Sequence, residues 1–260
     1  MTRIDTAYLA LLQSIQQKPT VFFEATKKVK LNEGDDGPIV ALYPMRGRAS
    51  TVDVMFIGRA LNSWTWNFPV PDDVTDLDDL LAGIKVNVGK GDTIYPTREQ
   101  LRWVDDRDGT HHSGYNSNQS QFWQAIKGIM GSREPDPTID DTQWWDGIVW
   151  TNFHKLSHKG GNPTRSMNSV MGTAALDLLR AEITTFQPKN IVCLSGLDWA
   201  TGLLASCDKT IRKADCAGLS YVDYVDDVSV DGTKARLLVA EHPQGRKREV
   251  LVRKVTQHLA

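Results

Sequence analysis

Residues 147–163 read Gly-Ile-Val-Trp-Thr-Asn-Phe-His-Lys-Leu-Ser-His-Lys-Gly-Gly-Asn-Pro. The first five residues predict a short buried strand, and the remainder predicts a basic loop rich in glycine. Asn152 lies where the predicted strand ends. Because ligands of open α/β sheets bind outside the carboxyl ends of the strands, we expect the Asn152 amide to face a cleft. An amide carries both a donor and an acceptor, so Asn152 suits the edge of a nucleobase.

The loop after Asn152 is rich in side chains that suit phosphate. They are His154, Lys155, His158, Lys159 and Arg165. A second basic segment covers 246–254 and begins with Arg246, Lys247 and Arg248. Contacts to phosphate set the register of a protein on DNA without reading sequence. A base reader beside such cations indicates an enzyme of nucleic acids.

Outward from this stretch, strands and helices alternate along the chain. Apolar runs predict strands at 52–57, 147–151, 190–194, 219–230 and 235–241, and helical spacing predicts helices at 4–18, 119–130, 168–186, 198–204 and 246–259. Asp231-Gly232 predicts the turn of a hairpin between the last two strands. This order predicts a single α/β domain over 1–260, a three-layer α/β/α sandwich with a mostly parallel central sheet. Residues 65–118 have poor periodicity and predict an inserted loop or lid with short helices.

Composition narrows the class of protein. The chain has 260 residues, is 40% hydrophobic and carries a net charge of -2, so DNA affinity has to come from local basic patches. The three cysteines form no CxxC pair, so we expect no metal, no cofactor and a reducing, cytoplasmic location. No apolar run approaches the roughly 20 residues of a membrane span. We therefore expect no membrane partner and no signal peptide, and a monomer that binds DNA.

Three predicted strand ends and one helix start share a pattern. They are Gly58-Arg59-Ala60-Leu61-Asn62-Ser63-Trp64, Trp150-Thr151-Asn152, Glu241-His242-Pro243 and Ser120-Gln121-Phe122-Trp123. Together they resemble the uracil-DNA glycosylase superfamily over about 52–258, apart from the segment 65–118. The subfamily pattern most like them is that of the iron–sulfur and thermophile enzymes, through Lys155, Gly161-Asn162-Pro163 and the segment 179–194.

The resemblance implies a role for each of these segments. It implies that the loop after the first strand holds the catalytic water, with Asn62 as a candidate, and that His242 stabilises the departing base. It implies a base pocket formed by the following residues: Gly58, Arg59, Ala60, Trp64, Phe122 and Asn152. The basic residues of 154–165 and 246–248 would then hold DNA phosphates.

This chain departs from the family pattern at two points. The iron–sulfur members place a cluster ligand in the helix matched by Ala174 and Ala175, so we expect no cluster here. Many members have Asp or Asn where this chain has Ala60, which leaves the residue that activates water open; Asp105, Asp106, Asp108, His111 and His112 are other candidates. The aromatic insertion predicts room for a bulky, modified pyrimidine, such as glucosylated hydroxymethylcytosine of phage DNA.

Three other interpretations of the same sequence stay open. One is an ordinary repair glycosylase for uracil or another deaminated base. Another is a module of the same fold that binds DNA or a nucleotide without chemistry, which the alanine at Ala60 favours. The third is an enzyme like a nucleoside hydrolase. A protein that binds DNA should respond steeply to salt, whereas a small-molecule hydrolase should not.

Overall fold

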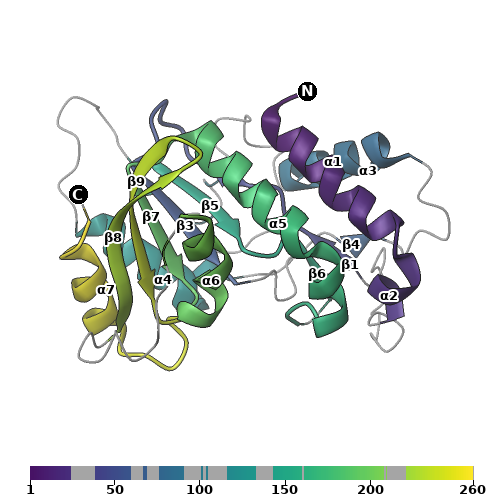
Figure 1. Cartoon of the computed structure of the whole chain (residues 1–260). Helices are drawn as coiled ribbons and strands as arrows, with labels where there is room; N and C mark the ends of the chain where they lie inside the picture. Colours follow the sequence, from purple (N-terminus) through teal and green to yellow (C-terminus); the bar gives the residue numbers. More distant parts are fainter. Residues whose placement is uncertain are drawn as a thin grey trace.

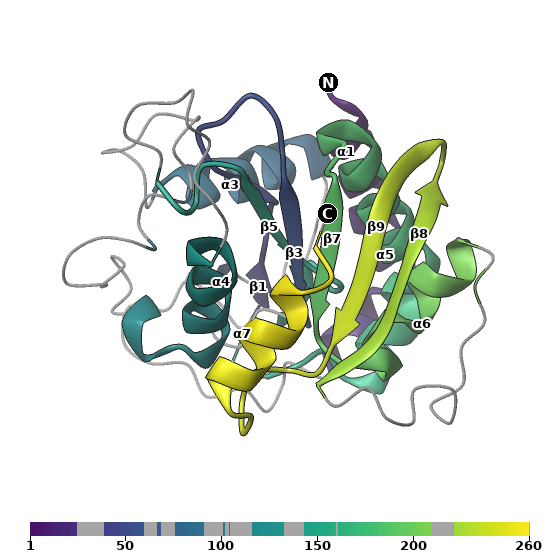
Figure 2. The same ribbon diagram turned by 90° about the vertical axis from the view of Figure 1, so that its left-hand side faces the viewer.

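The computed structural model describes residues 1–24, 39–59, 67–68, 76–90, 101, 104, 116–132, 143–159, 161–207, 209 and 221–259. A six-stranded sheet lies at its centre, in the order β2-β5-β3-β7-β9-β8 (Figures 1 and 2). Its strands are β2 (Met45–Arg46), β3 (Val54–Gly58), β5 (Ile148–Asn152), β7 (Asn190–Leu194), β8 (Val222–Val230) and β9 (Thr233–Ala240). The strands β5, β3, β7 and β9 run parallel, and β2 and β8 are antiparallel edges. The predicted mostly parallel sheet of an α/β chain is confirmed.

Helices cover both faces of this sheet because successive strand residues point to opposite sides. They are α4 (Gln121–Gly131) and α7 (Arg248–Thr256) on one face, and α5 (Arg165–Phe186) and α6 (Leu197–Ser206) on the other (Figure 2). Phe56 of β3 belongs to a buried apolar cluster with α4 and α7. Its neighbours Met55 and Ile57 belong to a second cluster with α5 and α6. The middle strands are buried on both faces, as their continuous apolar runs predict.

A third apolar cluster lies beside the main sheet. Tyr8 and Leu11 of α1 (Arg3–Gln16) pack there against Leu178 of α5 and Leu156 of a small antiparallel sheet. That sheet has the order β4-β1-β6, and its strands are β1 (Ile39–Ala41), β4 (Asn67–Phe68) and β6 (Leu156–His158). The sequence did not predict this sheet, because strands of two or three residues are too short to show a period.

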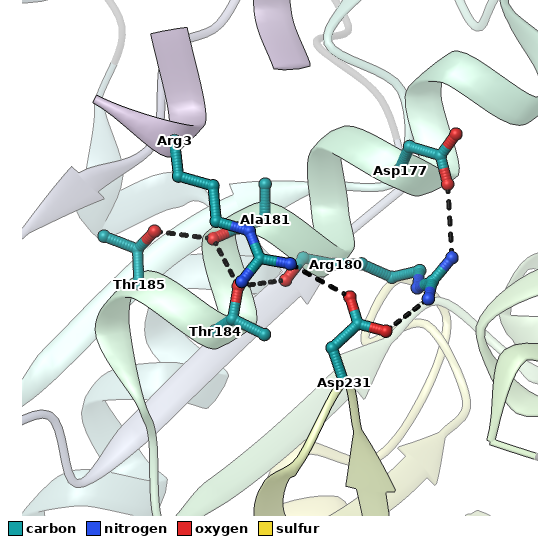
Figure 3. Close-up of polar contacts among 7 residues, drawn as sticks. All are labelled: Arg3, Asp177, Arg180, Ala181, Thr184, Thr185 and Asp231. Atoms are coloured by element: carbon teal, nitrogen blue, oxygen red, sulfur yellow. Dashed lines mark hydrogen bonds and ion pairs between the residues drawn. The ribbon is translucent and has the colours of Figure 1, made fainter. Parts of the chain in front are cut away.

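The hairpin between β8 and β9 turns at Asp231 and Gly232, as predicted. Both residues have positive φ, 47° and 85°, which the short turns of hairpins require. The Asp231 carboxylate accepts from Arg3 at 3.2 Å and also pairs with Arg180 of α5 (Figure 3). Arg180 pairs in turn with Asp177 at 3.3 Å, and the hydroxyls of Thr184 and Thr185 donate to helix carbonyls, including that of Ala181. This network joins the start of α1, the middle of α5 and the hairpin.

The bounds of the other helices differ modestly from the sequence predictions. Thr2 and Asp5 form a capping box at the start of α1, and a separate helix, α2 (Pro19–Phe23), starts at the proline that was expected to end it. The last helix, α7, is shorter at both ends than the predicted 246–259. In 65–118, the described residues include β4, α3 (Leu77–Lys90) and a 3-10 turn (Ser117–Gln119), so α3 is longer than the short helices expected. None of the helices in the described ranges has the length and apolar character of a membrane span.

Candidate functional site

The strand order marks one place where a ligand is expected. From β3 the chain passes through α4 to β5 on one side, whereas β7 and β9 lie on the other side of β3. The last helix before β5, α4, and the helix that follows β7, α6, cover opposite faces of the sheet. Ligands of doubly wound sheets bind where neighbouring strands diverge in this way, outside their carboxyl ends. The candidate site is thus the end of the sheet where β3, β5, β7 and β9 terminate.

Asn152 sits on Gly58 at this edge. The two residues are partners in the parallel pairing of β5 and β3. A Cβ atom at position 58 would lie 2.2 Å from Oδ1 of Asn152 and 3.4 Å from a ring carbon of Phe122. Only glycine leaves room for the amide in this position. The structure therefore brings together three residues that the family resemblance assigns to the base pocket.

The Asn152 amide has an unused donor. The residue is 2% exposed, and among the residues that the structure describes its Nδ2 has no hydrogen-bond partner. Leaving a buried donor without a partner costs about 1–3 kcal/mol, so each such group calls for an explanation. A ligand acceptor would satisfy Nδ2. Because Asn152 is buried, its amide does not open directly onto a cleft, as the sequence led us to expect.

Phe122 and Trp123 both pack against the apolar cluster beneath α4, and Phe122 also lies at the candidate site. Trp123 is 3% exposed and packs in the cluster beneath α4, whereas Phe122 is half-buried and lies against Gly58. Ser120 caps the first turn of α4 by accepting from the amide of Trp123. The cap sets where the helix begins, and so fixes which of the two aromatic rings faces the strand ends.

Arg59 follows β3 directly and crosses to the end of β7. Its Nε donates to the carbonyl oxygen of Ser195 at 2.8 Å, and its guanidinium carbon lies 5.8 Å from the ring centroid of Trp199. The ring of His154 packs edge-on against the same tryptophan, with centroids 5.4 Å apart. Burial lowers the pKa of Arg59, although the charge of Asp198 opposes the shift. Within the described part of the chain, no carboxylate lies within ion-pair distance of Arg59.

His242 follows β9 and is half-buried. Its Nδ1 accepts a hydrogen bond from the backbone amide of Gln244 at 3.2 Å. Neutral histidine with Nδ1 as acceptor carries its proton on Nε2. Burial, helped by the charge of Arg59, lowers the pKa of His242 to about 4. His242 is therefore neutral near pH 7 and presents an Nε2–H donor.

Lys155 is not a phosphate contact, and that prediction is wrong. Its side chain is fully buried, with an exposed fraction of 0%. The ammonium lies 2.9 Å from the Glu182 carboxylate and donates to the hydroxyl of Thr151 at 2.6 Å. It also donates to the backbone carbonyl of Asn152. A cation with these partners inside the protein cannot reach DNA.

The other basic residues that the sequence assigned to DNA fall into two groups. His158 and Lys159 lie at the end of β6, half-buried, and Arg165 is exposed at the start of α5. Arg246, Lys247 and Arg248 are exposed at the start of α7, just after His242. Two of them have acidic or amide partners: Arg246 pairs with Glu241 at 2.6 Å, and Arg248 contacts Gln124. The second group is next to the candidate site along the chain, and it is exposed enough to meet a polyanion.

Several predicted site residues lie outside the described residues. They are Ala60, Asn62 and Trp64, together with the alternative water activators Asp105, Asp106, Asp108, His111 and His112. In the described ranges, no group of three or more His, Cys, Asp or Glu side chains is placed to hold a metal ion. Cys193 is a buried free thiol, and Cys207 is also buried.

Sequence reasoning missed Glu182, Ser195 and Trp199. A signal for Glu182 was present, since it shares the helical spacing of Ala175, Leu178 and Leu179 and so lies on the apolar side of α5. An acidic residue on such a face needs a buried cation. Trp199 lies in the first turn of a helix that begins directly after a strand end, which is where ligands of these sheets are met.

Gly58→Ala tests how closely the amide of Asn152 packs against Gly58. The added methyl group would overlap Oδ1, so we expect the amide to be displaced and the free energy of unfolding to fall by roughly 1–3 kcal/mol. Urea denaturation measures the loss. Gly131→Ala in α4 is the matched control, because a Cβ there has nothing within 4 Å. If Gly58→Ala lowers the free energy of unfolding no more than Gly131→Ala does, the Asn152 amide is not closely packed against Gly58.

No protein-family model matches this sequence, and a search of curated proteins gives no significant match.

Proposed function

We propose that this protein is a DNA glycosylase with a uracil-DNA glycosylase-like α/β/α sandwich, which extrudes a base and hydrolyses its N-glycosidic bond. The observation that carries the proposal is the buried, unpartnered Nδ2 of Asn152, seated on Gly58 at the carboxyl end of a parallel sheet. The neutral Nε2–H donor of His242 at the end of the same sheet supports it. The same residues, Gly58, Asn152 and His242, belong to the strand-end segments that resemble that superfamily.

The proposed chemistry follows from the charges that develop as the bond breaks. The sugar becomes cationic and the departing base becomes anionic, so donors aimed at a base oxygen lower the barrier. The Nε2–H of His242 supplies such a donor without giving up a proton. Asn152 reads the edge of the extruded base through its amide. In this proposal, the segment that begins at Ala60 and includes Asn62 holds the attacking water.

Binding a base in this site requires that it leave the DNA stack. Extrusion costs a few kcal/mol, which stacking on aromatic side chains and hydrogen bonds to the base edge offset. Phe122, whose ring lies against Gly58, is one aromatic candidate for stacking, and Trp64 is a second. The protein binds DNA as a monomer in this proposal. The phosphates on either side of the extruded base are held by Arg246, Lys247 and Arg248.

We propose a bulky, modified pyrimidine as the substrate, as in phage DNA that carries glucosylated hydroxymethylcytosine, with a role in defence against phage. The support is in the sequence: an aromatic-rich segment at 65–118 and the alanine at Ala60, where many related enzymes have an acidic or amide residue. A base with extra groups gives the site more binding energy to use in the transition state.

The substrate is identified by matched duplexes that carry uracil, hydroxymethylcytosine or glucosylated hydroxymethylcytosine at one position. We expect abasic sites at the bulky base, detected by strand cleavage in alkali, and slower or no release of uracil. Asn152→Ala, purified in the same way, is the control for contaminating enzymes. Fast release of uracil alone would make the protein an ordinary repair glycosylase. DNA binding with no release of any base would make it a binding module.

A further inference from the structure

A buried charge network lies directly behind Asn152. Lys155, just after β5, and Glu182, near the C-terminal end of α5, form an ion pair at 2.9 Å, and both side chains have an exposed fraction of 0%. Thr151 joins them, since its hydroxyl donates to Glu182 at 2.9 Å and accepts from Lys155 at 2.6 Å. The network thus links the end of β5 to the helix that covers it.

The ammonium of Lys155 has a full set of partners. An ammonium carries three protons, and this one meets Glu182, the hydroxyl of Thr151 and the backbone carbonyl of Asn152. Burial lowers the pKa of Lys155 and raises the pKa of Glu182, and the charge of each partner opposes the shift of the other. Three acceptors around one nitrogen fit the charged amine, with the carboxylate as its counterion.

Stability alone does not account for such a pair. Moving two charges out of water costs several kcal/mol per ion, and buried pairs can often be replaced by apolar residues at little or no loss of stability. Locally, the pair holds the backbone carbonyl of Asn152, because Lys155 donates a hydrogen bond to it. The chain beyond is held as well, because the amides of Phe153 and His154 donate to the carbonyls of Gly58 and Arg59 at 3.0 and 3.3 Å.

The position of the Asn152 amide is therefore constrained from two sides. Gly58 limits the side chain from the neighbouring strand, and Lys155 fixes the backbone from which the side chain projects. Displacement of a positioned group by about 1 Å can cost 100-fold in rate. A rigid backbone at this residue matters most if its amide has to meet a ligand in one orientation.

We propose that Lys155, Glu182 and Thr151 form a positioning network, which fixes Asn152 so that its amide meets the base in a single orientation. This inference rests on the proposed function only in taking the ligand to be an extruded base. The three residues do not touch the base themselves. Their positioning role is separate from any contribution to the stability of the fold.

The experiment uses the double variant Lys155→Met with Glu182→Leu, which removes both charges and keeps similar volume. We expect its thermal midpoint to stay within a few degrees of wild type or to rise, and its affinity for duplex to stay unchanged. Single-turnover excision at saturating enzyme should fall about 10- to 100-fold. Lys85→Met is the matched control, because it removes a half-exposed ion pair with Asp5 on α1.

A second readout does not depend on catalysis. The side-chain NH2 of Asn152 gives a pair of NMR signals, identified by their loss in Asn152→Ala. We expect these signals to shift and broaden in the double variant and to stay unchanged in Lys85→Met. Unchanged signals would overturn the positioning role, whether or not any base is excised, and excision at the wild-type rate would overturn it too. If the wild-type protein excises no base, the proposed function fails. The NMR signals then still show whether the network positions the Asn152 amide.

Thr151→Val keeps the test decisive if the double variant does not fold. Valine has the shape of threonine but removes the hydroxyl that bridges the two charges. We expect a smaller shift of the Asn152 signals in the same direction, with the protein folded. Signals identical to wild type in this variant would likewise overturn the proposal.

Discussion

Asn152→Asp is expected to lower the rate of base excision by on the order of 100-fold or more, because it replaces the unused Nδ2 donor by a carboxylate oxygen. The two side chains have the same shape, so the contact with Gly58 is kept. An acceptor in place of the donor leaves the acceptor on the base unsatisfied. Sites built to hydrogen-bond one ligand group strongly reject a ligand that cannot make that hydrogen bond. The variant should therefore lose the natural substrate or accept a different base.

The measurement is single-turnover excision together with duplex affinity. Affinity should change little, because phosphate contacts supply most of it. Asn118→Asp, at an exposed position in the 3-10 turn before α4, is the control for the added charge. Excision by Asn152→Asp at the wild-type rate would show that Asn152 does not read the base.

The strands of the main sheet could be predicted because each is a continuous apolar run that is buried on both faces. Val54–Gly58 and Asn190–Leu194 are examples, and both were found within two residues of the predicted bounds. The hairpin at Asp231 and Gly232 was equally visible, because few residues adopt positive φ. These local signals do not depend on what packs against them.

The small sheet could not be predicted, since β1, β4 and β6 are too short for a pattern and form only by pairing across large separations in the chain. Ile39, for example, pairs with Phe68 and with His158. The same limit explains Lys155. A lysine in a basic stretch resembles a surface cation, and only the partner on α5, Glu182, shows that the chain turns back into the core there.

The candidate site was predictable to the extent that it depends on strand ends. Gly58, Asn152 and His242 follow or end three parallel strands, and a parallel sheet brings such residues to one edge. The contacts among them depend on packing. The seat of Asn152 on Gly58, the link from Arg59 to Ser195 and the ring of Trp199 beneath Arg59 require the folded chain.

Substitutions of His242 can separate the roles of its two ring nitrogens. Nδ1 anchors the loop by accepting from Gln244, and we propose that Nε2–H stabilises the departing base. Asparagine at 242 places an amide oxygen near Nδ1 and keeps the anchor without the donor, whereas glutamine places an amide nitrogen near Nε2 and keeps the donor. We expect His242→Ala and His242→Asn to lose about 100-fold or more in single-turnover rate, and His242→Gln to lose less.

The pH dependence provides the second part of this test. Because the pKa of His242 is lowered to about 4, the imidazole is neutral throughout pH 5.5–8, and its titration should leave the excision rate unchanged in that range. An imidazolium acid with an ordinary pKa near 6.5 would instead lose rate tenfold per unit above that value. His258→Ala, in the last residues of the chain, is the control for removing a histidine. Equal losses in the Asn and Gln variants, or an effect on DNA affinity alone, would make His242 a loop anchor or a phosphate contact rather than the donor to the departing base.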